Sequence, residues 1–336
     1  MSNRVASQFV QKGDVGSIYG GVQVDGALGL KDALVTAGLD WTVAIDKIRM
    51  AKKTGGKVIP GHFATYRTDT GDPLGIVKTR YTPVQNKDAF SWLENVIGQD
   101  GACITSAGAL HGGRYTWVCI DLGGFDVLPD DSVRKHMLVL NSHDGSSNLL
   151  VQLIPHRIVC QNILNFSFGS RDGAGSEPFK VRHTDTAMVK MSEIQRVISI
   201  AHHNFDEVQE AFKLFRETPV TEEQNQNLIY ASLGVTEEDL EEFSKGEYKK
   251  QPQWINHAEL INQVIADGPG ADIPGVRGTV WGTFNGINSY YDHVRIVRGA
   301  GVNPDNAIES KLMGHAAKMK TRAFEVCNDA LEVLRN

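Results

Sequence analysis

The sequence predicts an α+β fold: an antiparallel, hairpin-built sheet with helices packed on one face, followed by a mainly helical C-terminal region. Through the first half of the 336 residues, short apolar runs alternate with turn residues, which is the pattern of sequential hairpins. From about residue 184, apolar residues recur every three to four positions, which is helical periodicity. We therefore expect a loose N-terminal arm over residues 1–29, a sheet domain over 30–183 and a helical region over 184–336 that packs on the sheet.

The strongest hairpin signal is Asp144-Gly145, which lies between the apolar runs Met137–Leu140 and Leu149–Ile154. Asp-Gly between two strand-like runs predicts a tight turn, because glycine tolerates the positive φ that such a turn needs. Asn86 is expected to cap a helix between two earlier hairpins. The other elements expected in the first half are a helix at Leu30–Leu39 and strands at Trp41–Ile48, His62–Thr68, Leu74–Tyr81, Cys103–Leu110 and Tyr115–Leu122.

In the second half, Thr218-Pro219 is expected to end a long helical pattern that begins at Thr184. Trp281–Asn288 is rich in Asn, Gly and aromatic residues, which favours a bent segment near a site, although a hinge that packs two subdomains explains it equally well. The remaining helices are expected at Thr221–Leu228, Thr236–Phe243, Trp254–Ala266 and Asn306–Leu334, the first two with capping boxes or acidic first turns.

Composition excludes several classes of protein. The chain has 41% hydrophobic and 22% charged residues, as globular proteins do, and no apolar run approaches the ~18 residues of a membrane span. The N-terminal segment lacks the apolar core of a signal peptide. Four well-separated cysteines without a CxxC pair disfavour structural zinc and indicate reduced thiols in a cytoplasm. Neither GxGxxG nor a phosphate loop occurs, so we expect no cofactor.

Four blocks carry a family resemblance: AGLDW (Ala37–Trp41), RYTPVQNKDAFSWL (Arg80–Leu93), SAGALHGGR (Ser106–Arg114) and NSHDGS followed by PHRIVCQN. Their order and spacing resemble the phage/plasmid-like protein family, filed as domain of unknown function 932, over roughly the first two hundred residues. The resemblance implies an origin in a mobile element and hence a role in DNA metabolism. It supplies no catalytic residues.

A basic stripe marks the expected terminal helix. Lys311, His315, Lys318 and Arg322 stand at i, i+4, i+7 and i+11, which places them on one helical face, with Lys320 close by. No acidic residue falls between Lys311 and Arg322, although the net charge of the chain is −6. Such a stripe is commonly a solvated face. The functional interpretation is a ridge that binds phosphates.

A second basic set is interleaved with aromatic residues on the expected strands and in the C-terminal region. This pattern suits single-stranded nucleic acid, because bases stack on rings while the backbone follows cations. The ordinary explanation is that aromatic residues favour strands. The candidate binding residues of this set are Arg80, Tyr81, Arg114, Trp117, Arg157, Tyr290, Tyr291 and Arg295.

A third group contains possible metal ligands or a nucleophile: His143, Asp144, His156 and Cys160, with His183 further on. The hairpin could bring His143 and His156 together, but their spacing fits no zinc signature and the turn needs Asp144. A Cys160–His156 nucleophile pair lacks a recognisable third member. We therefore expect no bound metal, and a turn aspartate with partly buried histidines is the simpler interpretation.

The first hypothesis is a phage- or plasmid-encoded, non-catalytic DNA-metabolism protein that binds single-stranded DNA, with strand annealing as an extension, as a homo-oligomer in the cytoplasm of a bacterial host. Phage single-strand annealing proteins also combine an antiparallel sheet with helices, a similarity of fold alone. One alternative is a metal-dependent nuclease or hydrolase that uses the His143/Asp144/His156 region. Another is a host-interaction protein that counters host defence.

Overall fold

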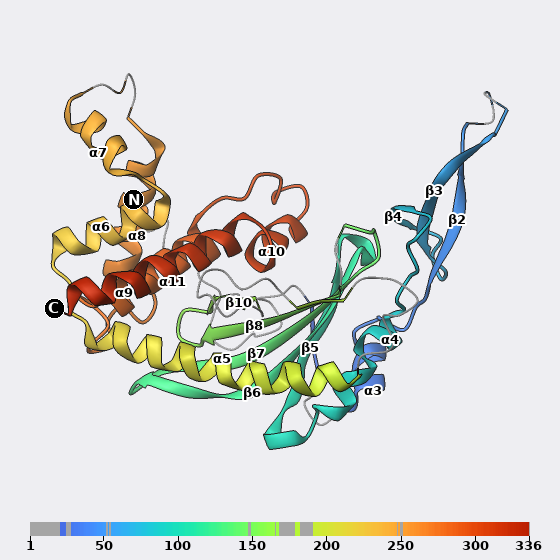
Figure 1. The fold of residues 1–336 in the computed structure, drawn as a ribbon, viewed down its shortest axis with the longest axis horizontal. Coiled ribbons are helices and arrows are strands. Elements are labelled where there is room, and N and C mark those ends of the chain that lie inside the picture. The colour runs from blue at the N-terminus through green and yellow to red at the C-terminus, as the bar shows by residue number, and fades with distance from the viewer. Residues whose placement is uncertain are drawn as a thin grey trace.

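The computed structural model describes residues 21–24, 28–51, 53, 55–146, 149–164, 166–167, 179–181, 191–246, 248 and 251–335. The fold is α+β, as the sequence predicts, with antiparallel sheets and a helical C-terminal region (Figure 1). A main sheet lies at the centre of the molecule. A smaller second sheet projects from one end of it, and most of the helices gather at the other end.

The main sheet has the strand order β1-β5-β6-β7-β8-β10, and β9 and β11 also pair with β8. Its pairings are antiparallel, and the consecutive strands β5 to β8 follow each other through turns. Val22–Gln23 pairs with β5, so the arm expected to be loose contributes a short strand. The strands are β1 (Val22–Gln23), β5 (Cys103–Leu110), β6 (Tyr115–Leu128), β7 (Asp131–Ser142), β8 (Leu149–Arg157), β9 (Asn162–Ile163), β10 (Phe166–Ser167) and β11 (Phe179–Val181).

The hairpin predicted at Asp144-Gly145 joins β7 to β8 and is confirmed. Leu140 stands opposite Leu150, and Gly145 has a φ of +77°. The Asp144 Oδ1 atom accepts a hydrogen bond from the backbone N–H of Ser146 at 2.9 Å, which closes the turn locally. The turn could be predicted from sequence because its conformation depends on the residues within the turn itself.

Helices cover both faces of the main sheet, not one face as expected. Along β6, Val118 and Ile120 face one core, and Trp117 and Cys119 face another, and all four are buried. The first core also includes residues of α3 (Leu30–Thr36), α4 (Asn86–Phe90) and η2 (Ser91–Asn95). Leu312 of α10 (Asp305–Leu312) closes the second core. The short helical turns η3 (Gln99–Gly101) and η4 (His111–Gly113) flank β5.

The second sheet consists of β2 (Val43–Arg49), β3 (Val58–Arg67) and β4 (Pro73–Lys78) in that order. Its root rests on the β7–β8 turn, where the Thr65 hydroxyl donates to the carbonyl oxygen of His143 at 2.7 Å. From there the β2–β3 ribbon extends away from the rest of the molecule (Figure 1).

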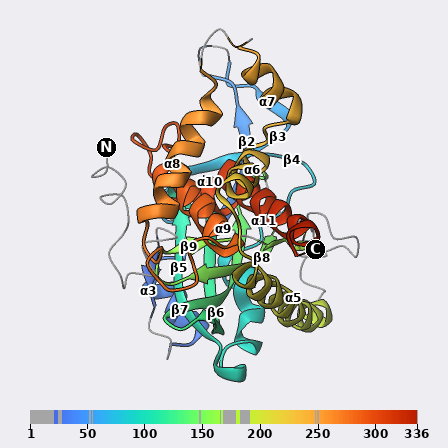
Figure 2. The same ribbon diagram turned by 90° about the vertical axis from the view of Figure 1, so that its left-hand side faces the viewer.

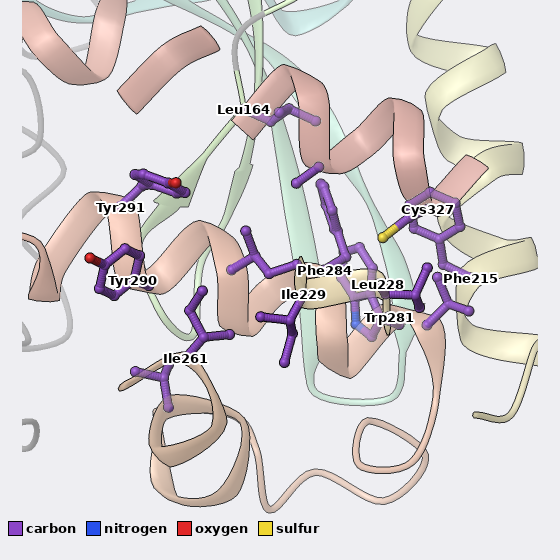
Figure 3. Packing of buried hydrophobic residues seen from close by; sticks show 14 of the residues in the cluster. Leu164, Phe215, Leu228, Ile229, Ile261, Trp281, Phe284, Tyr290, Tyr291 and Cys327 are labelled. Carbon is purple, nitrogen blue, oxygen red and sulfur yellow. The ribbon is translucent and has the colours of Figure 1, made fainter. Parts of the chain in front are cut away.

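The C-terminal helices enclose a large core with the ends of the central strands. In Figure 2 they stand in front of the main sheet, and Figure 3 shows Phe215, Trp281 and Phe284 packed inside this core. Both predicted capping boxes are present, at Thr221 and Thr236. The helices are α5 (Met191–Glu217), α6 (Glu222–Leu233), α7 (Glu237–Ser244), α8 (Gln253–Asp267), α9 (Val280–Ser289), the π-helical turn η6 (Tyr290–Val294), α10 and α11 (His315–Leu334).

Three local expectations were wrong. Trp281–Asn288 is not bent but lies within the fully buried α9. There, a β-carbon on Gly286 would lie 2.2 Å from the Ile265 side chain, so glycine permits close helix packing. Asn86 does not cap a helix, because its side chain is buried and donates to the carbonyl oxygen of Leu39 at 3.0 Å. Asn306–Leu334 is two helices, not one.

Candidate nucleic-acid interface

The break between α10 and α11 divides the predicted basic ridge. A β-carbon on Gly314 would lie 2.8 Å from the Cα atom of Ser310, so glycine allows the chain to change direction there. Lys311 consequently belongs to the last turn of α10 and is half-buried. His315, Lys318 and Arg322 lie on one face of α11 and are exposed.

Arg295 reaches this part of the surface from a different segment. It follows η6, and its guanidinium carbon lies 6.0 Å from the ring centroid of Tyr291. The same tyrosine ring lies 6.1 Å from the ring of His315. The fold thus brings Arg295 and His315, twenty positions apart in sequence, against one aromatic ring. We call Arg295, His315 and Lys318 the α11 basic cluster, with Lys311 and Arg322 at its margins.

The charges of the cluster act on one another. Burial lowers the pKa of His315, and the positive charges of Arg295 and Lys318 lower it further. Burial also lowers the pKa of His257 on α8, and Arg295 and His315 add to that effect. A charge changes the pKa of another group only at short range, since the screening length at physiological salt is only ~8 Å. The four groups therefore lie close together. An anion placed there would reverse the effect and favour protonation of both histidines.

Arg322 has a structural partner. Its Nε atom donates to the carbonyl oxygen of Ala231 at 3.1 Å, at the C-terminus of α6. The guanidinium packs beside Gly234, the left-handed residue that ends α6. A cation at this position satisfies a helix-terminal carbonyl and suits the helix dipole. Arg322 therefore serves α6 as well as the exposed face of α11.

Lys320, which the sequence places beside the ridge, is completely buried. Its ammonium group donates to Asp292 Oδ1 and to the carbonyl oxygen of Ile163, both at 2.6 Å. The other Asp292 oxygen accepts from the backbone N–H of Ile163 at 2.9 Å. These bonds connect α11, η6 and β9, and so fix the two segments that carry the α11 basic cluster.

The aromatic residues expected to stack on bases lie inside the protein. Tyr290 and Tyr291 are 2% and 3% exposed, and Trp117 is fully buried. Figure 3 shows the two tyrosines side by side at one edge of the helical core. Tyr81 is half-buried, and its hydroxyl donates to the carbonyl oxygen of Ser142 at 3.1 Å. Burial of these rings argues against the expected stacking role, which sequence could not distinguish from core packing.

The remaining basic candidates do not join the α11 basic cluster. Arg157 is buried in a bidentate ion pair with Asp131, at 2.6 and 2.8 Å, so it is not accessible to nucleic acid. Arg114 is exposed but pairs with Asp144 at 2.8 Å beside the β7–β8 turn. Arg80 is exposed after β4, at the base of the second sheet.

The proposed metal or hydrolase region is not assembled. His156 pairs with Arg134 in the β7–β8 register, whereas His143 lies at the turn, nine residues along β7 and hence roughly 30 Å away. The His143 ring bonds to Asn86 Oδ1 at 2.8 Å. His183 lies outside the described residues. Across the described part of the chain, no group of three or more His, Cys, Asp or Glu residues is placed to hold a metal ion.

The Cys160–His156 pair is also unsuited to nucleophilic chemistry. Burial raises the pKa of the Cys160 thiol, which disfavours the reactive thiolate. His156 packs against His136 with ring centroids 5.2 Å apart, and burial lowers the pKa of each ring to about 3. Both histidines are therefore neutral residues of the interior.

Sequence reasoning missed His257, whose ring lies 5.6 Å from that of Tyr290. It is 38 positions before Arg295, on a helix with no basic pattern, and only the tertiary fold brings it to the cluster. Gly314 was also not recognised as a helix boundary, and this had a larger effect on the predicted site because the break divides the basic ridge. A glycine inside an otherwise periodic pattern could have been taken as a break.

The geometry defines an α+β protein with a basic surface cluster where α11 meets η6. A family model described as "Domain of unknown function (DUF932)" matches residues 73–313, and the chain belongs to this family. The match begins after the Ala37–Trp41 block and extends into the C-terminal region, beyond the earlier resemblance. No curated protein and no solved structure is significantly similar to the chain. Within the described ranges, no helix is both long and apolar enough to cross a membrane.

Proposed function

We propose that this protein binds single-stranded DNA through the α11 basic cluster and performs no catalysis on it. The observation on which the proposal rests is that half-buried Arg295 lies beside exposed His315 and Lys318, in a chain whose net charge is −6. An acidic surface repels phosphate, so a local group of cations creates the contrast that guides a strand to one place. The family resemblance suggests a phage or plasmid origin, and hence work in the cytoplasm of a bacterial host, as a homo-oligomer.

The start of α11 supports phosphate as the group recognised. Its first turn contains no acidic residue, and Gly314 before it offers no side-chain cap, while the Ala316 N–H of that turn donates to Ser310 Oγ at 3.3 Å. The N-terminal N–H groups and dipole of a helix favour an anion. Lys318 stands one turn further along the same face, so one strand could contact the helix start and the lysine together.

The buried aromatic rings favour annealing over sequence-specific binding. With Tyr290 and Tyr291 in the core, the cluster contacts backbone and leaves bases free. A strand held by its phosphates keeps its pairing edges available to a complementary strand. The exposed α11 positions from His315 to Arg322 span only about 10 Å, a short contact that a flexible single strand can follow.

The test is titration of labelled oligonucleotides at several salt concentrations with wild type and an Arg295→Gln/Lys318→Gln variant. We expect wild type to bind oligo-dT, oligo-dA and mixed sequences with similar affinity. The variant should bind each more weakly, and its log–log salt slope should fall by roughly 0.7 for each lost contact, so about 1.4. Strand annealing measured with complementary oligonucleotides should slow in parallel.

The matched control is Lys31→Gln/Lys213→Gln, which removes two exposed cations outside the cluster. It should bind like wild type. Wild-type protein without salt-dependent binding would refute the proposal. So would an Arg295→Gln/Lys318→Gln variant that keeps the wild-type slope.

A further inference from the structure

The second sheet ends in an exposed ribbon. β4 pairs with β3 only from His62 onward, so beyond that point β2 and β3 form a two-stranded extension. Arg49 stands opposite Val58, and the Met50 N–H donates to the carbonyl oxygen of Lys57 at 2.8 Å. We call residues 47–61 the β2–β3 arm. A two-stranded ribbon without a covering layer is marginally stable alone, so docking would stabilise it.

The arm combines aliphatic and basic side chains on its surface. Met50, Val58 and Ile59 are 46%, 38% and 37% exposed. Residues 47–61 contain five basic residues and no acidic one, namely Lys47, Arg49, Lys52, Lys53 and Lys57. Phosphates would neutralise such cations but leave the aliphatic groups in water. A protein partner with carboxylates and an apolar side chain satisfies both.

This chain carries a surface of that chemistry at its opposite end. Helix α7 has five carboxylates within eight residues, and its Phe243 is 42% exposed. Figure 1 places α7 and the arm at opposite ends of the longest axis, and in Figure 2 both rise on the same side of the molecule. The two surfaces are therefore too far apart to meet within one copy.

We propose that the β2–β3 arm of one copy docks on helix α7 of the next. Lys53 and Lys57 would face the carboxylates of α7, and the aliphatic residues of the arm would cover Phe243. The contact joins two different surfaces, so each copy keeps one arm and one α7 free for further neighbours. Such an interface builds closed rings or open filaments. The proposal does not depend on the nucleic-acid surface, which uses other residues.

Two charge-reversal variants test it, Lys53→Glu/Lys57→Glu in the arm and Glu238→Lys/Glu241→Lys in α7. Light scattering after size exclusion, without DNA and at low salt, should give wild type a mass of several chains. Each variant alone should have the mass of one chain. Mixing the two should restore the large mass, because the reversed arm then meets a reversed α7 while the native arm meets a native α7.

A matched Lys31→Glu/Lys213→Glu variant should assemble like wild type, and circular dichroism should give folded spectra for all variants. A wild-type mass of one chain at every concentration would overturn the proposal, as would variants that assemble normally. If the arm variant keeps the wild-type mass but no longer binds oligonucleotides, the arm is instead a nucleic-acid surface. Because the mass is measured without DNA, its outcome is separate from that of the binding titration.

Discussion

The ammonium group of Lys320 lies 2.6 Å from a carboxylate oxygen of Asp292, and both side chains are almost completely buried, at 0% and 1% exposure. Lys320 is two residues after Lys318, and Asp292 is three residues before Arg295. The ion pair thus holds together the two segments from which the α11 basic cluster projects. Its role for that surface is positional, because neither side chain reaches solvent.

Removing one partner of this pair should destabilise the fold strongly. We expect Lys320→Met to lower the free energy of unfolding by about 3–5 kcal/mol, because Asp292 is left buried without its counter-charge. The double change Lys320→Met/Asp292→Leu should recover part of the loss, since apolar residues of similar volume replace both charges but leave the N–H and carbonyl oxygen of Ile163 without these partners. Urea unfolding measures both values. A single variant as stable as wild type would show that the pair is not closed in solution.

The buried histidines predict a pH dependence of stability. Burial lowers the pKa of His136 and of His156 to about 3, below the ~6.5 of an unfolded chain. The unfolded state therefore binds more protons as the pH falls below 6.5, and stability must decrease in that direction. Between pH 7 and pH 5, each ring should cost about 2 kcal/mol.

Urea unfolding at pH 7, 6 and 5 checks this expectation, with His156→Gln as the test variant and His203→Gln as control. His203 has a side chain that is 74% exposed, so its loss should leave the slope unchanged. His156→Gln should reduce the slope. Equal stability of the wild type at pH 7 and pH 5 would contradict the burial of the two rings.

The turn at Gly145 should not tolerate a side chain. Gly145 has a φ of +77°, and a β-carbon there would lie 2.9 Å from Val77 Cγ1. We expect Gly145→Ala to cost on the order of 1–3 kcal/mol through backbone strain, with the contact to Val77 adding to it. Gly301→Ala is the matched control, because a β-carbon there meets nothing within 4 Å. Equal melting temperatures of the two variants would mean that the turn is wrongly placed.

Substitutions at Arg322 and Lys318 should affect the free energy of unfolding and the oligonucleotide affinity differently. Arg322→Gln removes the bond from Nε to the carbonyl oxygen of Ala231, and we expect a loss of about 1 kcal/mol in the free energy of unfolding. Lys318→Gln should leave stability nearly unchanged, because an exposed charge contributes little. Oligonucleotide affinity should fall more for Lys318→Gln than for Arg322→Gln. The reverse order would place the binding surface further along α11.

Features with local causes could be predicted from the sequence. Asp144-Gly145 and the capping boxes at Thr221 and Thr236 depend on residues within four positions of each other, so their signals are complete in a short window. The hairpin-built sheet follows from such turns. The cations of α11 could also be found, because their spacing is a property of one helix.

Features with distant causes could not be predicted. Lys320 looks like its exposed neighbours until Asp292, 28 positions earlier, is known to face it. Arg157 resembles a free cation, but Asp131 lies directly beside it. The residue type of Tyr291 is compatible both with stacking on a base and with packing in a core. The sequence gives the type of each side chain, whereas the tertiary fold determines whether that side chain is exposed to solvent.

The carboxylate of Asp131 serves two partners at once. It accepts the bidentate bonds of Arg157 from β8 and a 2.8 Å bond from the indole N–H of Trp281 on α9. A change at Asp131 leaves the donors of both Arg157 and Trp281 buried without their acceptor, whereas a change at Arg157 leaves the Asp131 carboxylate buried without its counter-charge. Across relatives, these positions should therefore be inherited and replaced as a set. An alignment in which Asp131 varies freely while Arg157 and Trp281 stay fixed would show that evolution does not treat them as one unit.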